Sequence, residues 1–354
     1  MKALDRYIAV HVIVGTAFAM VILLSIFTFI AFIDDLETVG RGAYTYGNAV
    51  EYTLLTTPLR VFNLFPIAAV VGSLLGLGVL AANRELTAIR AAGVSVARIG
   101  AAVMKGALVL VLAAVLIGEV VAPPAESLAR EHRSDALAEQ WTARAGSGFW
   151  ARDGSSFINI GEVQPGDRLG NVRIYEFDGE GRLRVATAAD SAVYDASAWR
   201  LEGLRQSEIS DAGVTPREVA RAVWSSGFRP DLVKVVQVDP EGLSAVGLAR
   251  YIGYLRSNGL SAVRFRLALA KKIVYPAACA VMIYLTLPLV LGRLGASGVG
   301  QRVVVGSILG VGFHILNEAA GHVGVVYGLD PTFSAAAPTT AFLVLAIWMM
   351  RRIN

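Results

Sequence analysis

The chain has 354 residues, of which 55% are hydrophobic and only 17% are charged, and its mean hydropathy is +0.56. This composition excludes an ordinary soluble domain of this length and is typical of an integral membrane protein. The formal net charge is only +4 and the lysines and arginines are scattered along the chain, so the sequence lacks the dense basic patch typical of nucleic acid binding. The single cysteine, Cys279, excludes an intramolecular disulfide.

Six stretches are apolar and long enough to cross a bilayer as helices, since a hydrocarbon core of about 30 Å needs roughly 20 helical residues. They cover approximately residues 8–33, 61–82, 99–122, 273–294, 303–327 and 333–350. The first stretch is longer than the core of a signal peptide and has no small-residue cleavage pattern, so we expect it to be a retained anchor. The sequence therefore predicts six transmembrane helices.

Charges in the short flanks of these stretches predict their orientation. Positive residues gather on one side, at Lys2, Arg6, Arg84, Arg90, Arg98, Arg293, Arg302, Arg351 and Arg352. Acidic residues gather in the short loops on the other side, at Asp34, Asp35, Glu37, Glu51 and Asp330. Because lysine and arginine flank transmembrane helices on the cytoplasmic side, we expect both termini to be cytoplasmic.

A long hydrophilic insertion, residues 123–270, separates the third and fourth apolar stretches. Its middle contains FWARDGSSFINI, NVRIYEFDGEGRLRVATA and AVYDASAWRLEGL, in which short alternating runs rich in Val, Ile, Tyr and Trp are separated by turn residues. Closely spaced short strands of this kind indicate an all-β sandwich or jellyroll. The flanking sequences favour helical connectors. We expect three parts: residues 1–122, the inserted β domain at 123–270, and residues 271–354.

A short charged segment lies between the second and third apolar stretches and reads NRELTAIRAAGVSVARIG. Its apolar residues recur near helical spacing, so it is modestly amphipathic. We expect a helix over residues 83–92, with Asn83 as its N-cap, Glu85 at its positive end and Gly93 at its stop. Such a segment on the cytoplasmic side is suited to contact a soluble partner.

The fifth apolar stretch contains three ionisable residues, His314, Glu318 and His322, at intervals of four. This spacing places them on one helical face, where they suit metal ligation or proton transfer. They equally suit pairing with neighbouring helices or a wet cavity. The sequence has no H-E-x-x-H motif and no G-x-S-x-G motif, so hydrolytic chemistry has little support.

Other residues of the membrane region have simpler interpretations. The chain has no phosphate-binding loop, so it does not hydrolyse ATP by itself. Its glycines at Gly72, Gly76 and Gly78 favour close packing between helices. We expect Lys105 and Glu119, near opposite ends of the third stretch, to reach the membrane interface. The residues Arg130, Arg133, Arg264, Arg266, Lys271 and Lys272 form two basic collars, which suit either interfacial anchoring or an anionic lipid head group.

Several local strings, in their order and spacing, resemble the lipopolysaccharide-export permease family and its LptG-type branch in particular. They are LDRYI at 4–8, YTLL at 52–55, LLGLG at 74–78, GEVVAP at 118–123, FWARDGSSFINI at 149–160 and VVYG at 325–328. The resemblance spans nearly the whole chain. It implies an α-helical protein of the bacterial inner membrane with six transmembrane helices and an inserted periplasmic β-jellyroll.

The resemblance also implies partners and a substrate. The chain would assemble with an LptF-type permease, an LptB-type ATPase dimer and an LptC-type bitopic protein, and the substrate would be lipopolysaccharide. ATP and Mg would be bound by the partner ATPase, and no cofactor by this chain. In this family the helix between the second and third spans couples the permease to the ATPase. Here that helix would use Glu85 for electrostatic docking, Leu86 and Ile89 to fill an apolar recess, and Arg90 at the rim.

The resemblance further implies contacts with the transported lipid. Acyl chains would pass along the jellyroll interior, whose inward residues we expect to be Trp150, Phe157, Ile174, Val185, Trp199 and Leu201. The family pattern of lysines near the outer end of the first helix is replaced here by Asp34, Asp35 and Glu37. We therefore expect the lipid phosphates to contact Arg41, Arg60, Arg130 and Arg133, unless the partner subunit supplies the contact or the lipid carries different charges.

Three alternative functions remain compatible with the residues. A permease for another lipid or lipoprotein would keep the coupling helix but need a different outer domain. An intramembrane metal-dependent enzyme would use His314, Glu318 and His322. A membrane scaffold without transport would leave the glycine-rich spans and the coupling-type helix without a purpose.

Overall fold

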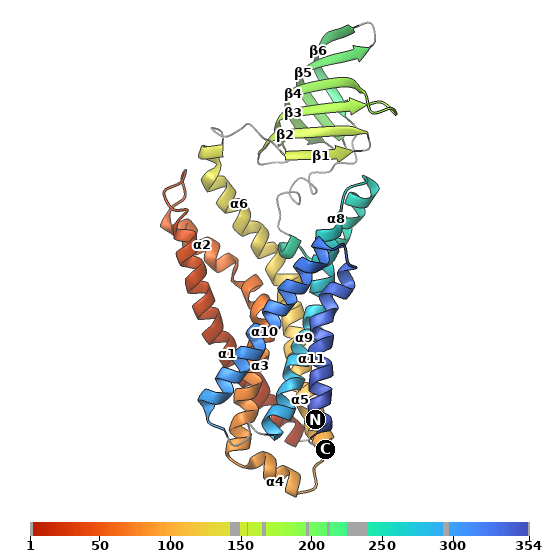
Figure 1. The fold of residues 1–354 in the computed structure, drawn as a ribbon. Coiled ribbons are helices and arrows are strands. Elements are labelled where there is room, and N and C mark those ends of the chain that lie inside the picture. Colours follow the sequence, from red (N-terminus) through yellow and green to blue (C-terminus); the bar gives the residue numbers. More distant parts are fainter. Residues whose placement is uncertain are drawn as a thin grey trace.

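The computed structural model describes residues 3–141, 149–153, 155–164, 168–195, 198–210, 213–224, 240–292 and 297–352. Within them, six helical segments are long and apolar enough to cross a membrane, which confirms the six predicted stretches. They are α1 (Ala3–Leu36), α3 (Thr57–Ala82), the helix that begins with α5 (Val96–Leu116), α9 (Val263–Leu291), α10 (Val299–Val326) and α11 (Pro331–Arg351). These helices form one elongated bundle with a β-sheet beyond one end (Figure 1).

Further helices lie toward the two ends of this bundle (Figure 1). The structure adds α2 (Tyr46–Leu55), α4 (Glu85–Ala91), α6 (Ala122–Trp141), the 3-10 helix η3 (Pro240–Gly242) and α8 (Ala245–Ser257). Helix α9 begins at Val263 rather than near residue 273, so the collar residues Arg264, Arg266, Lys271 and Lys272 lie within the helix and not before it. Hydropathy misses this start because charged side chains interrupt the apolar run, although they do not prevent helix formation.

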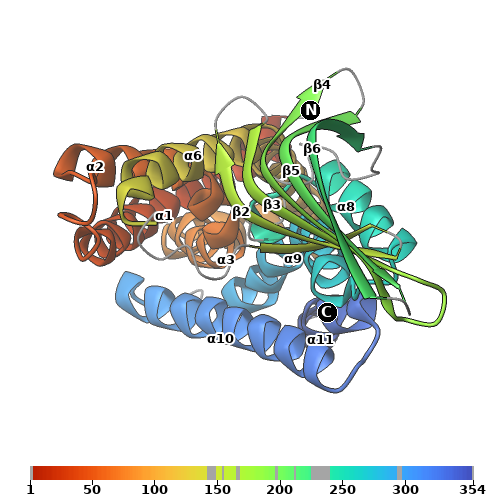
Figure 2. The same ribbon diagram turned by 90° about the horizontal axis from the view of Figure 1, so that it is seen from above.

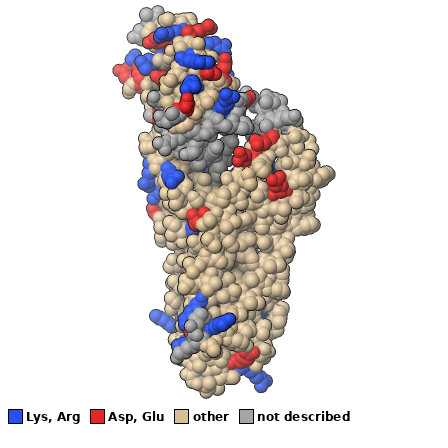
Figure 3. Space-filling model, turned by 180° about the vertical axis from the view of Figure 1, so that it is seen from behind, with Lys and Arg blue, Asp and Glu red and all other residues tan. Residues whose placement is uncertain are grey.

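The two ends of the bundle differ in what they carry, and we name them the α4 end and the sheet end. Both ends of the chain lie at the α4 end (Figure 1). On the face shown in Figure 3, a broad belt of uncharged surface separates charged residues at the α4 end from those at the sheet end. This distribution is expected of a protein whose middle faces hydrocarbon.

Helix α3 lies inside the bundle, with α1 and α6 on one side and α9 and α10 on the other (Figure 2). Glycines bring its backbone against that of α1. A Cβ atom added at Gly72 would lie 2.3 Å from the Cα of Thr16, and one added at Gly76 would lie 2.1 Å from the carbonyl oxygen of His11. Only glycine fits at these two positions, so the predicted close-packing role of these glycines is confirmed.

The third span is one continuous helical path from α5 through the π-helix η1 (Ile117–Val121) into α6. A Cβ at Gly118 would lie 2.4 Å from the Phe62 ring, so the π-helix needs glycine at this position. The neighbouring Glu119 accepts a hydrogen bond from the Ala245 amide at 2.8 Å and pairs with Lys272 at 3.4 Å. Glu119 is therefore held by contacts within the chain. Its carboxylate joins the two segments that lead into and out of the β domain.

The insertion forms a six-stranded antiparallel sheet whose strands follow in sequence order, which confirms the all-β insertion. The strands are β1 (Phe149–Asp153), β2 (Ser156–Gln164), β3 (Arg168–Phe177), β4 (Leu183–Asp195), β5 (Ala198–Ser210) and β6 (Gly213–Trp224). In the β2–β3 register Ile158 pairs with Ile174, whereas Phe157 pairs with Tyr175. Because adjacent side chains on a strand point to opposite faces, these two pairs lie on opposite faces of the sheet.

One face of the sheet forms a closed apolar core. Its buried residues include Ile158, Ile160, Val172, Ile174, Trp199, Leu201 and Leu204. Tyr254 of α8 packs against this core and also against a second cluster within α8 and its surroundings. Burial raises the pKa of Tyr254 to about 12. This side chain therefore anchors the sheet to the helix that returns the chain to the bundle.

The glycine contact between α1 and α3 makes a stability prediction. Gly72→Ala should lower the free energy of unfolding by about 1–3 kcal/mol, because its methyl group would overlap the α1 backbone. Gly312→Ala in α10 is the matched control, since no neighbouring atom lies within 4 Å of its added Cβ. Thermal unfolding of the purified protein in detergent measures both variants. Equal midpoints for the two would show that α1 and α3 do not meet as closely as described.

Candidate functional site

Helix α4 lies at the α4 end of the bundle and covers Glu85–Ala91, two residues later at its start than the expected range of 83–92. Asn83 closes α3 as its C-cap, and Arg84 occupies the N-cap position of α4 in a left-handed conformation with φ 59° and no side-chain cap. The prediction that Asn83 caps this helix is therefore wrong, because its backbone still belongs to α3. Gly93 has φ +84°, which confirms the predicted helix stop.

The apolar residues of α4 face its own bundle. Leu86 is only 4% exposed and belongs to the main core of the membrane helices, and Ile89 packs against the same core. The expectation that Leu86 fills a recess on a partner is therefore wrong, since the chain itself buries this side chain. Ile89 is half-buried. The exposed surface of this segment consists of Arg84, Thr87, Ala88, Arg90 and Ala91.

Glu85 is held at the edge of this surface by a residue of α1. Its carboxylate accepts a hydrogen bond from the Tyr7 hydroxyl at 2.7 Å and another from the Asn83 amide at 3.2 Å. These two hydrogen bonds, first that from Tyr7, lower the pKa of Glu85 below its ordinary value. The carboxylate is half-exposed, so it presents a fixed negative charge beside the exposed face of α4.

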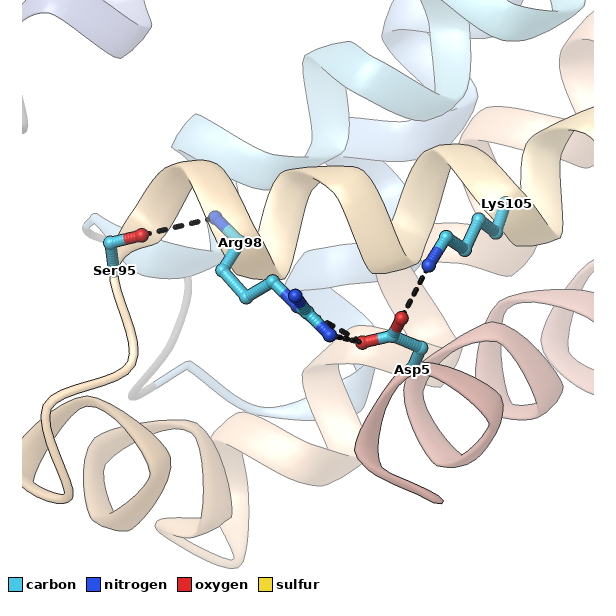
Figure 4. Close-up of polar contacts among 4 residues, drawn as sticks. All are labelled: Asp5, Ser95, Arg98 and Lys105. Carbon is cyan, nitrogen blue, oxygen red and sulfur yellow. Dashed lines mark hydrogen bonds and ion pairs between the residues drawn. The ribbon is translucent and has the colours of Figure 1, made fainter. Parts of the chain in front are cut away.

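A buried carboxylate joins α1 to α5 next to this site (Figure 4). Asp5 is 1% exposed. Its Oδ1 accepts hydrogen bonds from Arg98 Nη2 at 2.9 Å and Arg98 Nε at 3.2 Å, and its Oδ2 is bound by Lys105 Nζ. The Ser95 hydroxyl accepts a hydrogen bond from the Arg98 amide at 3.3 Å and caps α5. Lys105 therefore pairs with the carboxylate at the start of α1.

At the sheet end, Arg133 of α6 is committed to contacts within the chain. Its Nη1 lies 2.7 Å from Oδ1 of Asp35, and its guanidinium carbon lies 4.4 Å from the centre of the Tyr52 ring. The Tyr44 hydroxyl donates to Oδ2 of the same Asp35 at 2.5 Å. Burial, followed by this hydrogen bond, raises the pKa of Tyr44. Asp35, in the last turn of α1, thus neutralises one collar arginine.

The other three arginines expected to contact lipid differ in whether their side chains are bound by other residues of the chain. Arg130 pairs with Glu126 at 2.9 Å, and Arg60 donates to the Thr53 carbonyl oxygen at 2.8 Å. Arg41 is exposed, and no residue in the described part of the chain forms a hydrogen bond or ion pair with its side chain. Arg41 therefore carries the guanidinium most available to an external anion.

The six residues expected to line the interior of the β domain do not share one face. Ile174, Val185, Trp199 and Leu201 are buried. Trp150 and Phe157 lie on the opposite face and are 58% and 38% exposed. Together with Tyr175 and Phe177 they line a shallow apolar hollow, in which the Trp150 and Tyr175 rings stack with centroids 5.7 Å apart. The prediction of a single lining fails here because it ignored strand register.

The ionisable residues of α10 do not converge on a metal site in the part of the chain that the structure describes. Glu318 is bound by Lys271 of α9, with Nζ 2.9 and 3.0 Å from its two carboxylate oxygens. His314 and His322 are exposed. A cavity of about 200 Å³ between α3, α9 and α10 is lined by residues that include Asn317 and His314. The ion pair to α9 accounts for a carboxylate at this depth.

Sequence reasoning missed Asp5 and Tyr7, which the structure places beside α4. The available signal was an acidic residue at the start of one apolar stretch and a lysine, Lys105, inside another. Two opposite charges in separate spans favour a pair between helices. Spacing alone did not indicate which helices would meet.

Because Arg133 is paired within the chain, substituting it should reduce stability, whereas substituting an unpaired arginine should not. Arg133→Gln should lower the free energy of unfolding by about 2 kcal/mol or more, because it leaves the buried Asp35 carboxylate without its cation. Arg41→Gln, the same substitution at an exposed position, should leave the unfolding midpoint unchanged. Thermal unfolding of both variants in detergent tests this, and similar midpoints would mean that the pair with Asp35 contributes nothing.

Comparison with known proteins gives one consistent result. The model of the lipopolysaccharide export system permease LptF/LptG family matches residues 6–352. Lipopolysaccharide export system permease protein LptG of Escherichia coli strain K12 is 35% identical over 352 residues, which cover 99% of this chain and 98% of that protein. The LptG protein of Haemophilus influenzae is also 35% identical, over 355 residues covering 99% of both chains. The resemblance seen in the local strings is confirmed, and the chain belongs to the LptF/LptG family of lipopolysaccharide export system permeases.

Proposed function

We propose that this chain is the LptG-type permease subunit of a transporter that extracts lipopolysaccharide from the outer leaflet of the bacterial inner membrane and passes it to a periplasmic bridge. The observation that carries the proposal is the family match from residue 6 to residue 352, which includes the six helices and the inserted sheet. This match favours lipopolysaccharide over another lipid or lipoprotein as the substrate. It also favours transport over a scaffold or a metal-dependent enzyme.

The charge distribution supports an orientation in the membrane. Positive residues of the short flanks, among them Arg84, Arg90 and Arg351, lie at the α4 end, which the positive-inside rule assigns to the cytoplasm. The sheet end is then periplasmic. In this orientation α4 faces soluble proteins of the cell interior, and the sheet extends away from the bilayer toward the bridge.

Helix α4 is the proposed contact with an LptB-type ATPase dimer, which would bind the ATP and Mg. Leu86 and Ile89 fasten the helix to the bundle, while Thr87, Ala88 and Ala91 present a flat surface of small side chains. Glu85 and Arg90 flank this surface with opposite charges, which suits orientation of a partner more than tight binding. Closure of the ATPase dimer would then push on α4, so coupling is mechanical.

The exposure of two helices supports contact with a second, LptF-type permease and an LptC-type bitopic protein. Of the six spans, α1 and α10 are the least enclosed by the rest of the chain. Their outward faces carry large apolar residues, including Val14, Phe18, Val21, Ile308, Val311 and Ile315. Such faces suit either lipid or further transmembrane helices, and they suit the walls of a cavity that holds acyl chains.

The proposed lipid contacts follow from which residues are accessible. Arg41 is available to a phosphate at the sheet end, whereas Arg60, Arg130 and Arg133 are engaged within the chain. On the sheet, Trp150 and Phe157 are exposed and Ile174 is closed into the core. We therefore assign acyl-chain contact to the aromatic hollow and not to the face that carries Ile174.

Reversing the charge beside α4 tests the coupling. Glu85→Arg should reduce co-purification of the ATPase and lower ATP-driven release of lipopolysaccharide by roughly tenfold or more, since charge reversal at an interface replaces attraction by repulsion. Glu37→Arg is the matched control, an exposed glutamate at the sheet end. Release from proteoliposomes and the ATPase content of the purified complex are measured together. Full release with a bound ATPase in Glu85→Arg would contradict the assigned role of α4.

Photo-crosslinking tests the lipid path on the sheet. A crosslinking amino acid at Phe157 should capture lipopolysaccharide during ATP-driven transport, because this position is exposed in an apolar hollow. The same amino acid at Ile174, which is 2% exposed, and at Val214 on β6, which is 63% exposed outside the hollow, should not. Capture at Ile174 without capture at Phe157 would instead support a route along the core face.

A further inference from the structure

The first two turns of α1 contact α4 and α5, the two helices that follow α3 in the chain. Tyr7 donates to Glu85 of α4, and Asp5 binds Arg98 and Lys105 of α5. We call Asp5, Arg98 and Lys105 the Asp5 cluster. Helices α3, α4 and α5 are consecutive in sequence, whereas α1 is covalently distant from α4 and α5. The Asp5 cluster is therefore a tertiary link between the start of α1 and the helix that continues from α4.

The geometry of the Asp5 cluster opposes sliding of α5 along α1. Arg98 and Lys105 lie seven residues apart, which is about 10 Å along a helix and nearly two turns, so both project from one face of α5. The carboxylate sits between them, with Oδ1 on Arg98 and Oδ2 on Lys105 (Figure 4). Movement of α5 in either axial direction stretches one of the two contacts.

The neighbouring contact between these helices is a close approach of their backbones. A Cβ added at Gly106 would lie 3.1 Å from the Cα of Ala9, so the two backbones meet there through the smallest side chains. Small side chains allow close approach but form no deep ridges and grooves that would set an axial position. The charged contact thus adds a constraint on the register of α1 and α5 to the apolar packing around it.

A force on α4 reaches this contact directly. Only the segment from Ala92 to Ser95 separates α4 from α5, and Arg98 lies in the first turn of α5. The carboxylate of Asp5 is buried, whereas the side chains of Arg98 and Lys105 are 42% and 44% exposed. The shared anion thus holds two cations that would otherwise be free to turn to solvent.

We propose that Asp5 is a positioning residue that keeps α5 in register with α1, so that a displacement of α4 also moves α1. This inference rests on the proposed function, in which a partner ATPase pushes α4. Because α1 presents its outer face to lipid or to a second permease, its movement changes the surface that the transported lipid meets. Asp5 contacts neither the ATPase nor the lipid in this scheme.

The test is the ratio of lipopolysaccharide released to ATP hydrolysed by the reconstituted complex. Asp5→Asn removes the charge and keeps the shape, and the freed cations remain partly solvated, so we expect the complex to assemble. Hydrolysis should stay near the wild-type rate while the ratio falls by about threefold or more, as expected when a coupling contact is lost. Arg6→Gln, an exposed neighbour on α1, should keep the wild-type ratio.

A second set of variants separates coupling from simple stability. Lys105→Gln leaves Asp5 paired with Arg98 and should lower the ratio in the same direction. Adding Asp5→Asn to Lys105→Gln should lower it by less than the product of the two single effects, because both remove the same contact. If Asp5→Asn does not fold, Lys105→Gln and Arg98→Gln still provide the measurement.

Two results would overturn the inference. One is a wild-type ratio in Asp5→Asn, or in both Lys105→Gln and Arg98→Gln where Asp5→Asn does not fold. The other is an equal fall in hydrolysis and release, which leaves the ratio unchanged and indicates a structural role only. Failure of the proposed function looks different, since the wild-type complex would then release no lipopolysaccharide on ATP addition or would not retain the ATPase.

Discussion

A carboxylate within a membrane protein is costly unless a cation accompanies it, and this constraint organises the polar contacts of the bundle. Asp5 joins α1 to α5, Glu119 joins the π-helix η1 to α9, and Glu318 joins α10 to α9. Each pair links segments that are distant in sequence. The acidic residues of the spans therefore serve as connections between helices.

Close backbone packing supplies the complementary, rigid contacts. Gly72 and Gly76 bring α3 against α1 with no room for a side chain, which fixes both the distance and the crossing of these helices. Gly118 serves the π-helix in the same way by accommodating the Phe62 ring. The π-helix thus lies at the point of the long helix from α5 to α6 where Glu119 also binds the chain returning from the β domain.

The two ends of the molecule use charge differently. At the α4 end, Glu85 remains half-exposed and is oriented by Tyr7, which leaves it accessible to a partner. At the sheet end, the acidic end of α1 partly cancels the charge of the first basic collar, because Asp35 pairs with Arg133. Fewer cations are therefore unpaired there than the sequence suggests. Of the four arginines expected to contact lipid phosphates, Arg41 is the exposed one.

Much of the architecture was predictable from the sequence. Apolar length defines the six spans, alternation and turn residues define the β insertion, and the local strings identify the family, because each of these signals depends on residues near one another in the chain. The start of α9 was missed because Arg264 and Arg266 interrupt its apolar run, and the cap of α4 was misplaced because Asn83 belongs to α3.

The functional surfaces, in contrast, were decided by tertiary structure. Leu86 appeared available for a partner until the packing of α4 buried it, and Phe157 and Ile174 appeared to share a face until the strand register separated them. Asp5 and Lys105 are a hundred residues apart. Sequence shows that each carries a charge, but which helices lie close enough to pair those charges is determined only when the backbones pack.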